Sequence, residues 1–263
     1  MALTDKLTAI ADNIRSKTGG TEPLTLDGMA SGVNEVYDKG KEDEHNLIFD
    51  GFDDLYGFFY GGINAQIFNL IKPNDFSNVN SFTELFYDNA DLTIAPLFNT
   101  SSGKIFESMF KNCTNLITVP LYDLSNAGTV MYMFDGCDKL INVQTLNTSK
   151  ATNFTGMFRN CSSLTTIPQI DISNSMVRGV ANMFVNCTNL QNITFAGIIK
   201  VGDLNLSYSP NLTHDSLMSL INALADKSSF ASGTWKVIIG NTNIAKLTAE
   251  ELKIASDKNW EVA

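Results

Sequence analysis

The chain has 263 residues, of which 44% are hydrophobic and 17% charged, a composition typical of a folded protein rather than a disordered one. Its formal net charge is −10 and its basic residues form no cluster, which argues against a nucleic-acid partner. No apolar run approaches the ~20 residues of a membrane-spanning helix, so we expect no membrane insertion. The first residues lack the basic start and apolar core of a secretory signal, which predicts a protein that is made and kept in a cytoplasm, or that leaves it by assembly into a particle or by lysis.

The first 44 residues predict two short helices and a charged linker. Residues 1–18 carry an apolar stripe that Gly19-Gly20 brings to an end, and a second helix is expected to begin at Asp27. Residues 38–44 are charged and lack apolar anchors. Helices this short are marginal in water, so their stripes must pack against the rest of the chain or against another protein. The apolar positions are Leu3, Leu7, Ile10, Ala11 and Ile14 in the first helix, and Met29, Val33 and Val36 in the second.

The segment from Ile10 to Met29 resembles the N-terminus of tail-associated proteins of phages and prophages of Gram-positive bacteria. Those proteins open with a similar Ile-Ala-x-x-Ile-Arg-x-Lys-Thr-Gly helix, followed by a Leu-x-x-Met helix. The resemblance implies a virion component whose residues 1–40 attach it to other virion structural proteins. The candidate attachment residues are Leu7, Ile10, Ile14 and Met29. The alternative is a helical hairpin that caps the region following it.

Residues 45–84 contain a weaker version of the repeat that follows. Apolar residues recur there at i, i+3, i+4 and i+7, and Phe59 precedes Phe86 by 27 residues. Terminal repeats are atypical because they close the core against water, so we interpret residues 45–84 as a degenerate first unit. The aromatic run between Phe49 and Tyr60 fits packing in that cap, and the alternative is a carbohydrate-stacking surface.

Five regular units occupy residues 85–208. They begin at Leu85, Met109, Met133, Met157 and Met183, at steps of 24, 24, 24 and 26 residues. In four of them Met-Phe is followed at intervals of three by Cys and then Leu, and Asn89 replaces the cysteine in the first. A period in this range indicates stacked units that share a core. The shared slot predicts one column of rings formed by Phe86, Phe110, Phe134, Phe158 and Phe184.

Each unit predicts a short helical turn, a short strand and a return turn. The apolar residue three positions before each unit gives the i, i+3, i+4, i+7 spacing of one helical face. Proline at 96, 120 and 168 ends a strand or occupies a position that needs no ladder bond. The four cysteines predict a ladder of buried free thiols, because parallel side chains about 4.8 Å apart exceed the ~3.8 Å between the Cβ atoms of a relaxed disulfide.

The Met-Phe-x-x-Cys-x-x-Leu copies resemble the BspA-type leucine-rich repeat. The resemblance implies an α/β repeat fold: a BspA-type leucine-rich-repeat solenoid with a helical N-terminal segment (1–44), a repeat region (45–208) and an α/β C-terminal cap (209–263). Polar strand residues between the buried slots are expected to line one polar face, either as a partner-binding surface or as a solvated sheet. They are Thr118, Asn142, Thr166 and Asn192.

Residues 209–263 predict the capping module. Thr213 caps a helix with an apolar stripe from Leu217 to Leu224, and residues 235–239 read as a buried strand. Thr248 and Glu251 form a capping box for a further helix, and residues 260–262 are expected to lie beside the 235–239 strand.

Chemistry-bearing residues are sparse, and we expect no enzyme, cofactor or metal site. Neither His45 nor His214 is spaced to meet a nucleophile, and no cysteine pair has the spacing of zinc ligands. The function expected is that of a phage virion structural protein of the tail, baseplate or tail fibre, which binds a bacterial surface glycan or protein through the rod. The alternatives are a bacterial BspA-like surface adhesin and a phage head-decoration protein. Homo-oligomerisation stays open.

Overall fold

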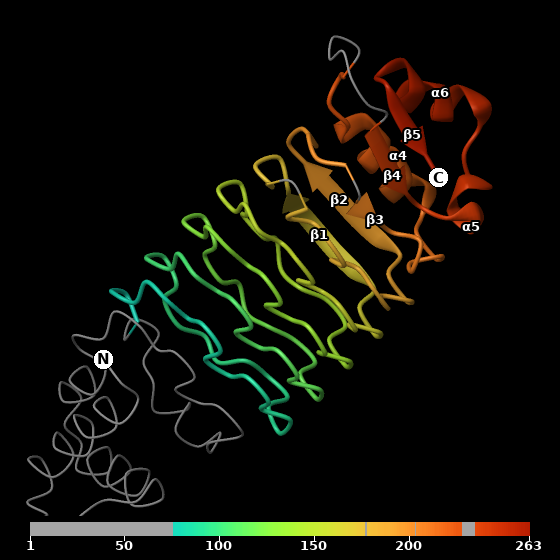
Figure 1. Ribbon diagram of the computed structural model, residues 1–263. Helices are drawn as coiled ribbons and strands as arrows, with labels where there is room; N and C mark the ends of the chain where they lie inside the picture. Colours follow the sequence, from blue (N-terminus) through green and yellow to red (C-terminus); the bar gives the residue numbers. More distant parts are fainter. Residues whose placement is uncertain (1–75, 177, 203, 228–234) are drawn as a thin grey trace, which may run out of the picture.

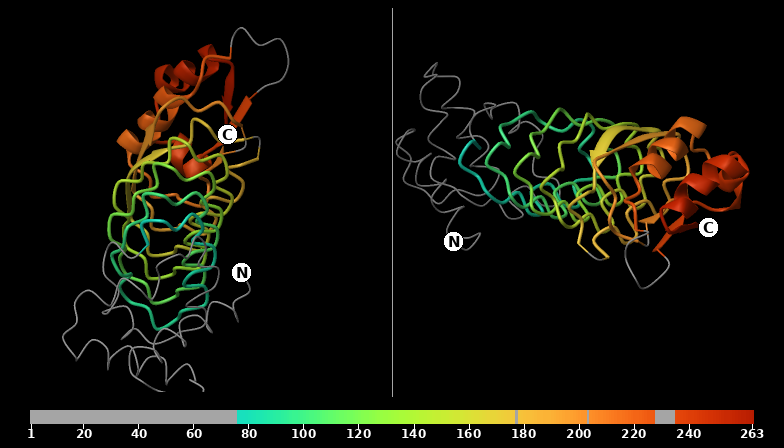
Figure 2. Two further views of the ribbon diagram at one scale, coloured as in Figure 1. Left: turned by 90° about the vertical axis from the view of Figure 1, so that its left-hand side faces the viewer. Right: turned by 90° about the horizontal axis from the view of Figure 1, so that it is seen from above.

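The computed structural model describes residues 76–176, 178–202, 204–227 and 235–263. The predicted N-terminal helices, the linker and nearly all of the degenerate first unit lie outside these residues. The described part is an elongated stack of coils that carries a compact α/β module at its C-terminal end (Figure 1). Figure 2 shows the stack from two further sides, with the helices gathered at one end.

Successive units lie side by side, and backbone hydrogen bonds join equivalent positions of neighbouring units. The amide of Phe86 donates to the carbonyl of Met109 at 2.8 Å, and Phe110 donates to Met133 at 2.9 Å. The same bond recurs from Phe134 to Met157 at 2.9 Å and from Phe158 to Met183 at 3.0 Å. Backbone groups are therefore satisfied between units, which is why one unit cannot fold alone.

The segment predicted as a short helical turn consists instead of consecutive β-turns. In the first unit Leu85, Tyr87 and Asn89 each donate to the carbonyl three residues earlier, while the residues between them donate to the next unit. Glu84 and Asp88 have φ of 54° and 58°, a left-handed conformation that breaks a helix. The helical interpretation was therefore wrong, and the described residues contain no α-helix before residue 214.

Left-handed residues recur in pairs at the start of each unit, four positions apart, with φ between 54° and 77°. The first slot holds Glu84, Ser108, Tyr132, Gly156 and Asn182, and the second holds Asp88, Asn112, Gly136, Asn160 and Asn186. Asn, Asp and Gly tolerate this conformation best, which accounts for the second slot. Glu and Tyr in the first slot are held there by the bonds to neighbouring units.

The predicted column of phenylalanine rings is confirmed. Neighbouring rings from Phe86 to Phe184 lie 5.2–6.1 Å apart between centroids and within 10° of parallel. All five rings are buried. The shared unit spacing sets the ring separation, so the column runs the length of the described stack.

The opposite wall of each coil is extended and forms a ladder of parallel bridges. Two strands are regular enough to be assigned, β1 (Thr166–Asp171) and β2 (Asn192–Ala196), and they pair in parallel. Earlier units contribute isolated bridges. Pro168 lies inside β1 where the register shifts between Ile167 and Ile170, so this proline occupies an irregular position rather than the end of the strand.

The C-terminal module contains the elements predicted for it. Helix α4 (His214–Ala223) begins after Thr213, whose side chain accepts from the amide of Ser216. Helix α6 (Ala249–Asp257) begins with the predicted Thr248–Glu251 capping box, and β5 (Trp260–Val262) pairs in parallel with β4 (Trp235–Ile238). Two elements were not foreseen: α5 (Asn241–Ile244) and β3 (Leu204–Asn205), which pairs with β4. This sheet therefore crosses the boundary expected at residue 208.

Helix α4 closes the exposed edge of the stack. The hydroxyl of Ser216 accepts from the amide of Ile193 at 3.0 Å, and that of Ser219 accepts from Phe195 at 2.9 Å. These amides belong to β2 and would otherwise face solvent or another chain. Past the helix, Ile199 and Leu224 form a further parallel bridge. Two serine side chains thus take the place of the next strand.

Candidate binding surfaces

The four polar residues singled out from the sequence lie on the extended wall of the stack. Asn142 bridges to Thr166, and Thr166 pairs with Asn192. Thr118 bridges to Ile94 of the preceding unit. Asn142 and Asn192 are exposed, and the two threonines are half-buried. Their equivalent positions in the repeat therefore predicted correctly that these residues lie on one face of the stack.

That face is not uniformly polar, which corrects the expectation of a polar sheet. Large apolar side chains are exposed in its first three units: Ile94, Leu97, Ile117, Leu121 and Ile141, at 66, 55, 41, 63 and 46%. Ile117 and Ile141 directly follow the buried Leu116 and Leu140, so strand alternation points them outward. The sequence shows these apolar residues, but the repeat pattern concerns only the buried slots and makes no prediction for positions 117 and 141.

We call residues 93–94, 117–118, 141–142, 165–166 and 191–192 the strand strip. None of its ten residues is buried and none is charged, although the chain as a whole has a net charge of −10. Ile117 donates its amide to Thr93, Ile141 to Ile117, and Thr165 to Ile141, at 2.9–3.1 Å, so the strip is a continuous ladder. Its backbone is held by the neighbouring coils. The Thr165 hydroxyl donates to the carbonyl of Ile141 at 3.1 Å and Asn192 Oδ1 accepts from Thr213 at 3.4 Å, while the other eight side chains make no hydrogen bond to described residues.

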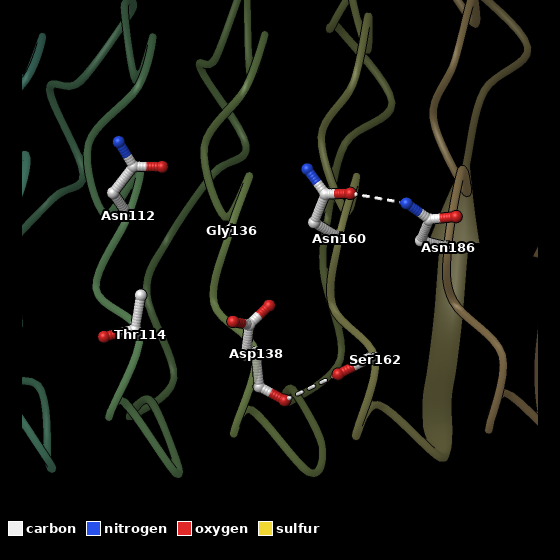
Figure 3. A pocket seen from close by; sticks show the side chains of 7 residues that line it. All are labelled: Asn112, Thr114, Gly136, Asp138, Asn160, Ser162 and Asn186. Atoms are coloured by element: carbon white, nitrogen blue, oxygen red, sulfur yellow. Dashed lines mark hydrogen bonds between the residues drawn. The ribbon is translucent and has the colours of Figure 1, made fainter.

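A second surface feature is a hollow of about 380 Å³ where the turns pass into the extended wall (Figure 3). We call it the polar hollow. It is lined by Asn112, Thr114, Gly136, Asp138, Asn160, Ser162 and Asn186. Sequence reasoning missed it, although the residue before the cysteine is Asn in three units and Gly only at position 136.

An ion pair and two cation–π contacts flank the polar hollow. The carboxylate of Asp135, buried in the turn, accepts from Arg159 Nε at 2.9 Å and from Nη2 at 2.6 Å, and from Asn160 Nδ2 at 3.2 Å. The hydrogen bond to Asp135 raises the pKa of the Arg159 guanidinium. Arg159 and Lys111 lie over the ring of Tyr132, at 5.1 and 5.2 Å from its centroid. These contacts fix the turns around the left-handed Tyr132.

The four cysteines form the predicted ladder, and their burial is confirmed. Each thiol donates to a phenylalanine carbonyl of the preceding unit at 3.0–3.1 Å. Burial raises the pKa of Cys113 and Cys187 to about 12 and that of Cys137 and Cys161 well above the usual range. A thiol that stays protonated is neither a nucleophile nor a metal ligand, so the ladder is structural.

Other groups with potential chemistry lie apart from these surfaces. His214 bonds to Glu251 at 2.8 Å between α4 and α6. Among the described residues, no cluster of three or more His, Cys, Asp or Glu side chains is placed to hold a metal ion. No helix in the described ranges is long and apolar enough to cross a membrane. The candidate attachment residues Leu7, Ile10, Ile14 and Met29 lie outside the described residues, as does His45.

Fold and surfaces together define a repeat protein that presents side chains on regularly spaced coils. A family model described as "Mycoplasma protein of unknown function, DUF285" matches residues 53–166 and 107–206, which together cover more than half of the chain. The chain therefore belongs to this family, which is related to BspA-like repeat proteins. No curated protein and no solved structure matches it. Neither matched range reaches the N-terminal segment 1–44.

Proposed function

We propose that this chain is a BspA-type leucine-rich-repeat solenoid that works as an adhesive rod, and that the strand strip is the surface that contacts its partner. The observation that carries the proposal is the strip itself: ten unburied, uncharged residues aligned across five units. Depletion of charge with exposed apolar side chains marks the centre of protein interfaces rather than an ordinary solvated sheet. Threonine and asparagine beside them supply hydrogen bonds that fix the orientation of the partner.

The strip suits a flat macromolecular surface better than a small ligand. Its isoleucine side chains, Ile94, Ile117 and Ile141, lie in the first three units, while the later units present Thr166, Gln191 and Asn192. A partner surface with an apolar patch next to a polar one would match this change from apolar to polar side chains along the strip. The fixed coil spacing keeps the contacting atoms in place, which lowers the ordering cost of binding.

The setting we propose is a phage virion, in the tail, baseplate or tail fibre, with residues 1–40 joined to other virion proteins. The resemblance of the Ile10–Met29 segment to phage tail-associated proteins supports this setting. The alternative is a bacterial surface adhesin, and the relation of the family to BspA-like repeat proteins favours it. The two settings share the same binding face, so one experiment on the strip tests the adhesive function in either.

The test measures binding of the purified full-length chain to intact Gram-positive cells and to their isolated cell walls. Ile117→Asp and Ile141→Asp place a charge in the strip and should weaken binding by roughly tenfold or more, as for residues at the centre of an interface. Met176→Asp is the matched control, because Met176 is 49% exposed and lies outside the strip. If both strip variants bind as tightly as the control, the strip is not the adhesive surface.

A further inference from the structure

A row of side-chain amides runs across the units at the second left-handed slot, and it has a fixed direction. Asn112 Nδ2 donates to the carboxylate of Asp88 at 2.7 Å, and Asn186 Nδ2 donates to Asn160 Oδ1 at 2.8 Å. A carboxylate only accepts, so the nitrogen of Asn112 must face the preceding unit and its oxygen the following one. Asn160 has the same orientation, since its nitrogen donates to Asp135 of the preceding unit.

Gly136 interrupts this row. With no side chain at position 136, Asn112 Oδ1 has no donor among the described residues, and it faces the gap from one side (Figure 3). A Cβ atom on residue 136 would lie only 2.7 Å from this oxygen. Across the gap lies the nitrogen of Asn160, which uses one proton for Asp135 at 3.2 Å and has a second one. An acceptor and a donor therefore face each other from two side chains whose backbones lie two coil steps, about 10 Å, apart.

A second row of polar groups lies beside the gap, formed by Thr114, Asp138 and Ser162 (Figure 3). Ser162 Oγ donates to the backbone carbonyl of Asp138 at 3.3 Å. Within the described part of the chain, the carboxylate of Asp138 and the hydroxyl of Thr114 have no hydrogen-bond partner. The polar hollow thus offers a ligand two sets of groups. One is the interrupted row of side-chain amides, and the other is the carboxylate of Asp138 with the hydroxyl of Thr114.

The chemistry of the lining selects the ligand. No lysine or arginine lines the hollow, so a phosphate or carboxylate ligand has no cation to pair with. Asp138 is the single carboxylate, which is fewer than a protein calcium site normally supplies. Every side chain that lines the hollow carries a polar group, so an apolar ligand would leave these groups without partners. What remains is a neutral molecule whose groups both donate and accept.

We propose that the polar hollow binds a neutral hexose or N-acetylhexosamine unit of a glycan. Two adjacent ring hydroxyls bridge the gap, because a single hydroxyl reaches only about 2.8 Å to each side. One donates to Asn112 Oδ1 and the next accepts from Asn160 Nδ2, and together they complete the amide row where residue 136 leaves it open. A neighbouring hydroxyl donates to the carboxylate of Asp138. The site is separate from the strand strip, and its ligand occupies a hollow rather than a flat face. The two proposals therefore stand or fall independently.

The experiment is a two-dimensional NMR titration of the full-length chain with glucose, galactose and N-acetylglucosamine in turn. At least one sugar should give saturable shifts of the backbone amide of Gly136 and of the side-chain amides of Asn112 and Asn160. The affinity should be on the order of millimolar, since the site is open to water. Calcium and inorganic phosphate, titrated separately, test the excluded ligand classes.

Gly136→Asn is the decisive variant. Its side chain completes the amide row in the left-handed slot that asparagine already occupies in three other units. Its Cβ would come within 2.7 Å of Asn112 Oδ1, so the flexible end of the Asn112 side chain must shift, and the melting temperature should stay close to that of the wild type. The variant should abolish sugar binding, because the new amide takes the place of the ligand. Asp138→Ala changes an exposed residue and should weaken binding roughly tenfold.

The proposal is overturned if none of the three sugars gives saturable shifts at Gly136. It is also overturned if Gly136→Asn binds sugar like the wild type, or if calcium or phosphate saturates the site instead.

Discussion

The cysteine ladder makes the stability of this protein steeply dependent on alkaline pH. Burial raises the pKa of Cys113 and Cys187 from 9.0 to about 12, and that of Cys137 and Cys161 also lies well above 9.0. Because these pKa values are raised in the folded state, the thiols stay protonated there while the unfolded chain begins to ionise near pH 9. Their contribution to stability is therefore complete below pH 9 and is lost as the pH rises toward 12.

The size of the stability loss follows from the difference between the folded-state and unfolded-state pKa of each thiol. At pH 10, one unit above the unfolded pKa, each thiol lowers the free energy of unfolding by about 1.4 kcal/mol. Four thiols together give a loss of about 6 kcal/mol, which is a large share of the ~5–15 kcal/mol typical of a folded domain. A variant that lacks two of the thiols isolates the share of the cysteines.

The assay is urea denaturation between pH 8 and pH 10 with a reductant present. Wild type is compared with the double variant Cys137→Ala/Cys161→Ala. The variant starts less stable, because each substitution leaves a small cavity, but it should lose about 3 kcal/mol less than wild type over this range. An identical pH slope in the two proteins would show that these thiols ionise in the folded state, and would refute the reasoning.

Three further predictions concern the core, the C-terminal edge and the N-terminal segment. Phe134→Ala should lower the free energy of unfolding by about 3–5 kcal/mol, because rings at 5.7 and 5.6 Å on either side prevent collapse around the void. Ile141→Ala, at a 46% exposed position, should change it by less than about 0.5 kcal/mol, and equal losses would contradict the ring column. Ser216→Ala removes the acceptor for the amide of Ile193 and should cost about 1–3 kcal/mol, with faster hydrogen exchange at that amide than in wild type; unchanged exchange would exclude the edge-closing role. Deleting residues 1–40 should leave the melting temperature unchanged and remove the protein from particles if the segment is an attachment module. A lowered melting temperature, or particles that retain the truncated protein, would argue against attachment.

The ring column and the C-terminal caps were predictable because their signals are local or strictly periodic. A residue that returns to the same slot of each unit must return to the same place in the stack, which fixed Phe86 to Phe184 as one column. The capping box is equally local, since Thr248 and Glu251 satisfy backbone amides within one turn of helix. Neither inference needed knowledge of how the units are hydrogen-bonded to one another.

The helical turn was mispredicted because the spacing of buried residues does not determine the backbone. Positions i, i+3, i+4 and i+7 face inward on a helix, and they also face inward on consecutive β-turns with a left-handed residue every fourth position. The left-handed residues and the destination of the amides distinguish the two conformations, and both depend on the assembled stack. The residue types at Glu84 and Tyr132 did not indicate a left-handed conformation, since neither glutamate nor tyrosine favours that region. Here the contacts between units override local preference.

Departures from the repeat carry more functional information than the repeat itself. The consensus positions, Met-Phe, Cys and Leu, are buried in the described units and therefore report on packing. Gly136 departs from an asparagine slot and opens the polar hollow, while Ile117 and Ile141 occupy an outward slot that later units fill with Thr165 and Gln191. Each departure changes what the surface presents without changing the core, because the outward slots make no contribution to the ring column or the thiol ladder. A rod of this kind can therefore acquire a new partner by substitutions at outward slots alone, while its buried columns stay constant.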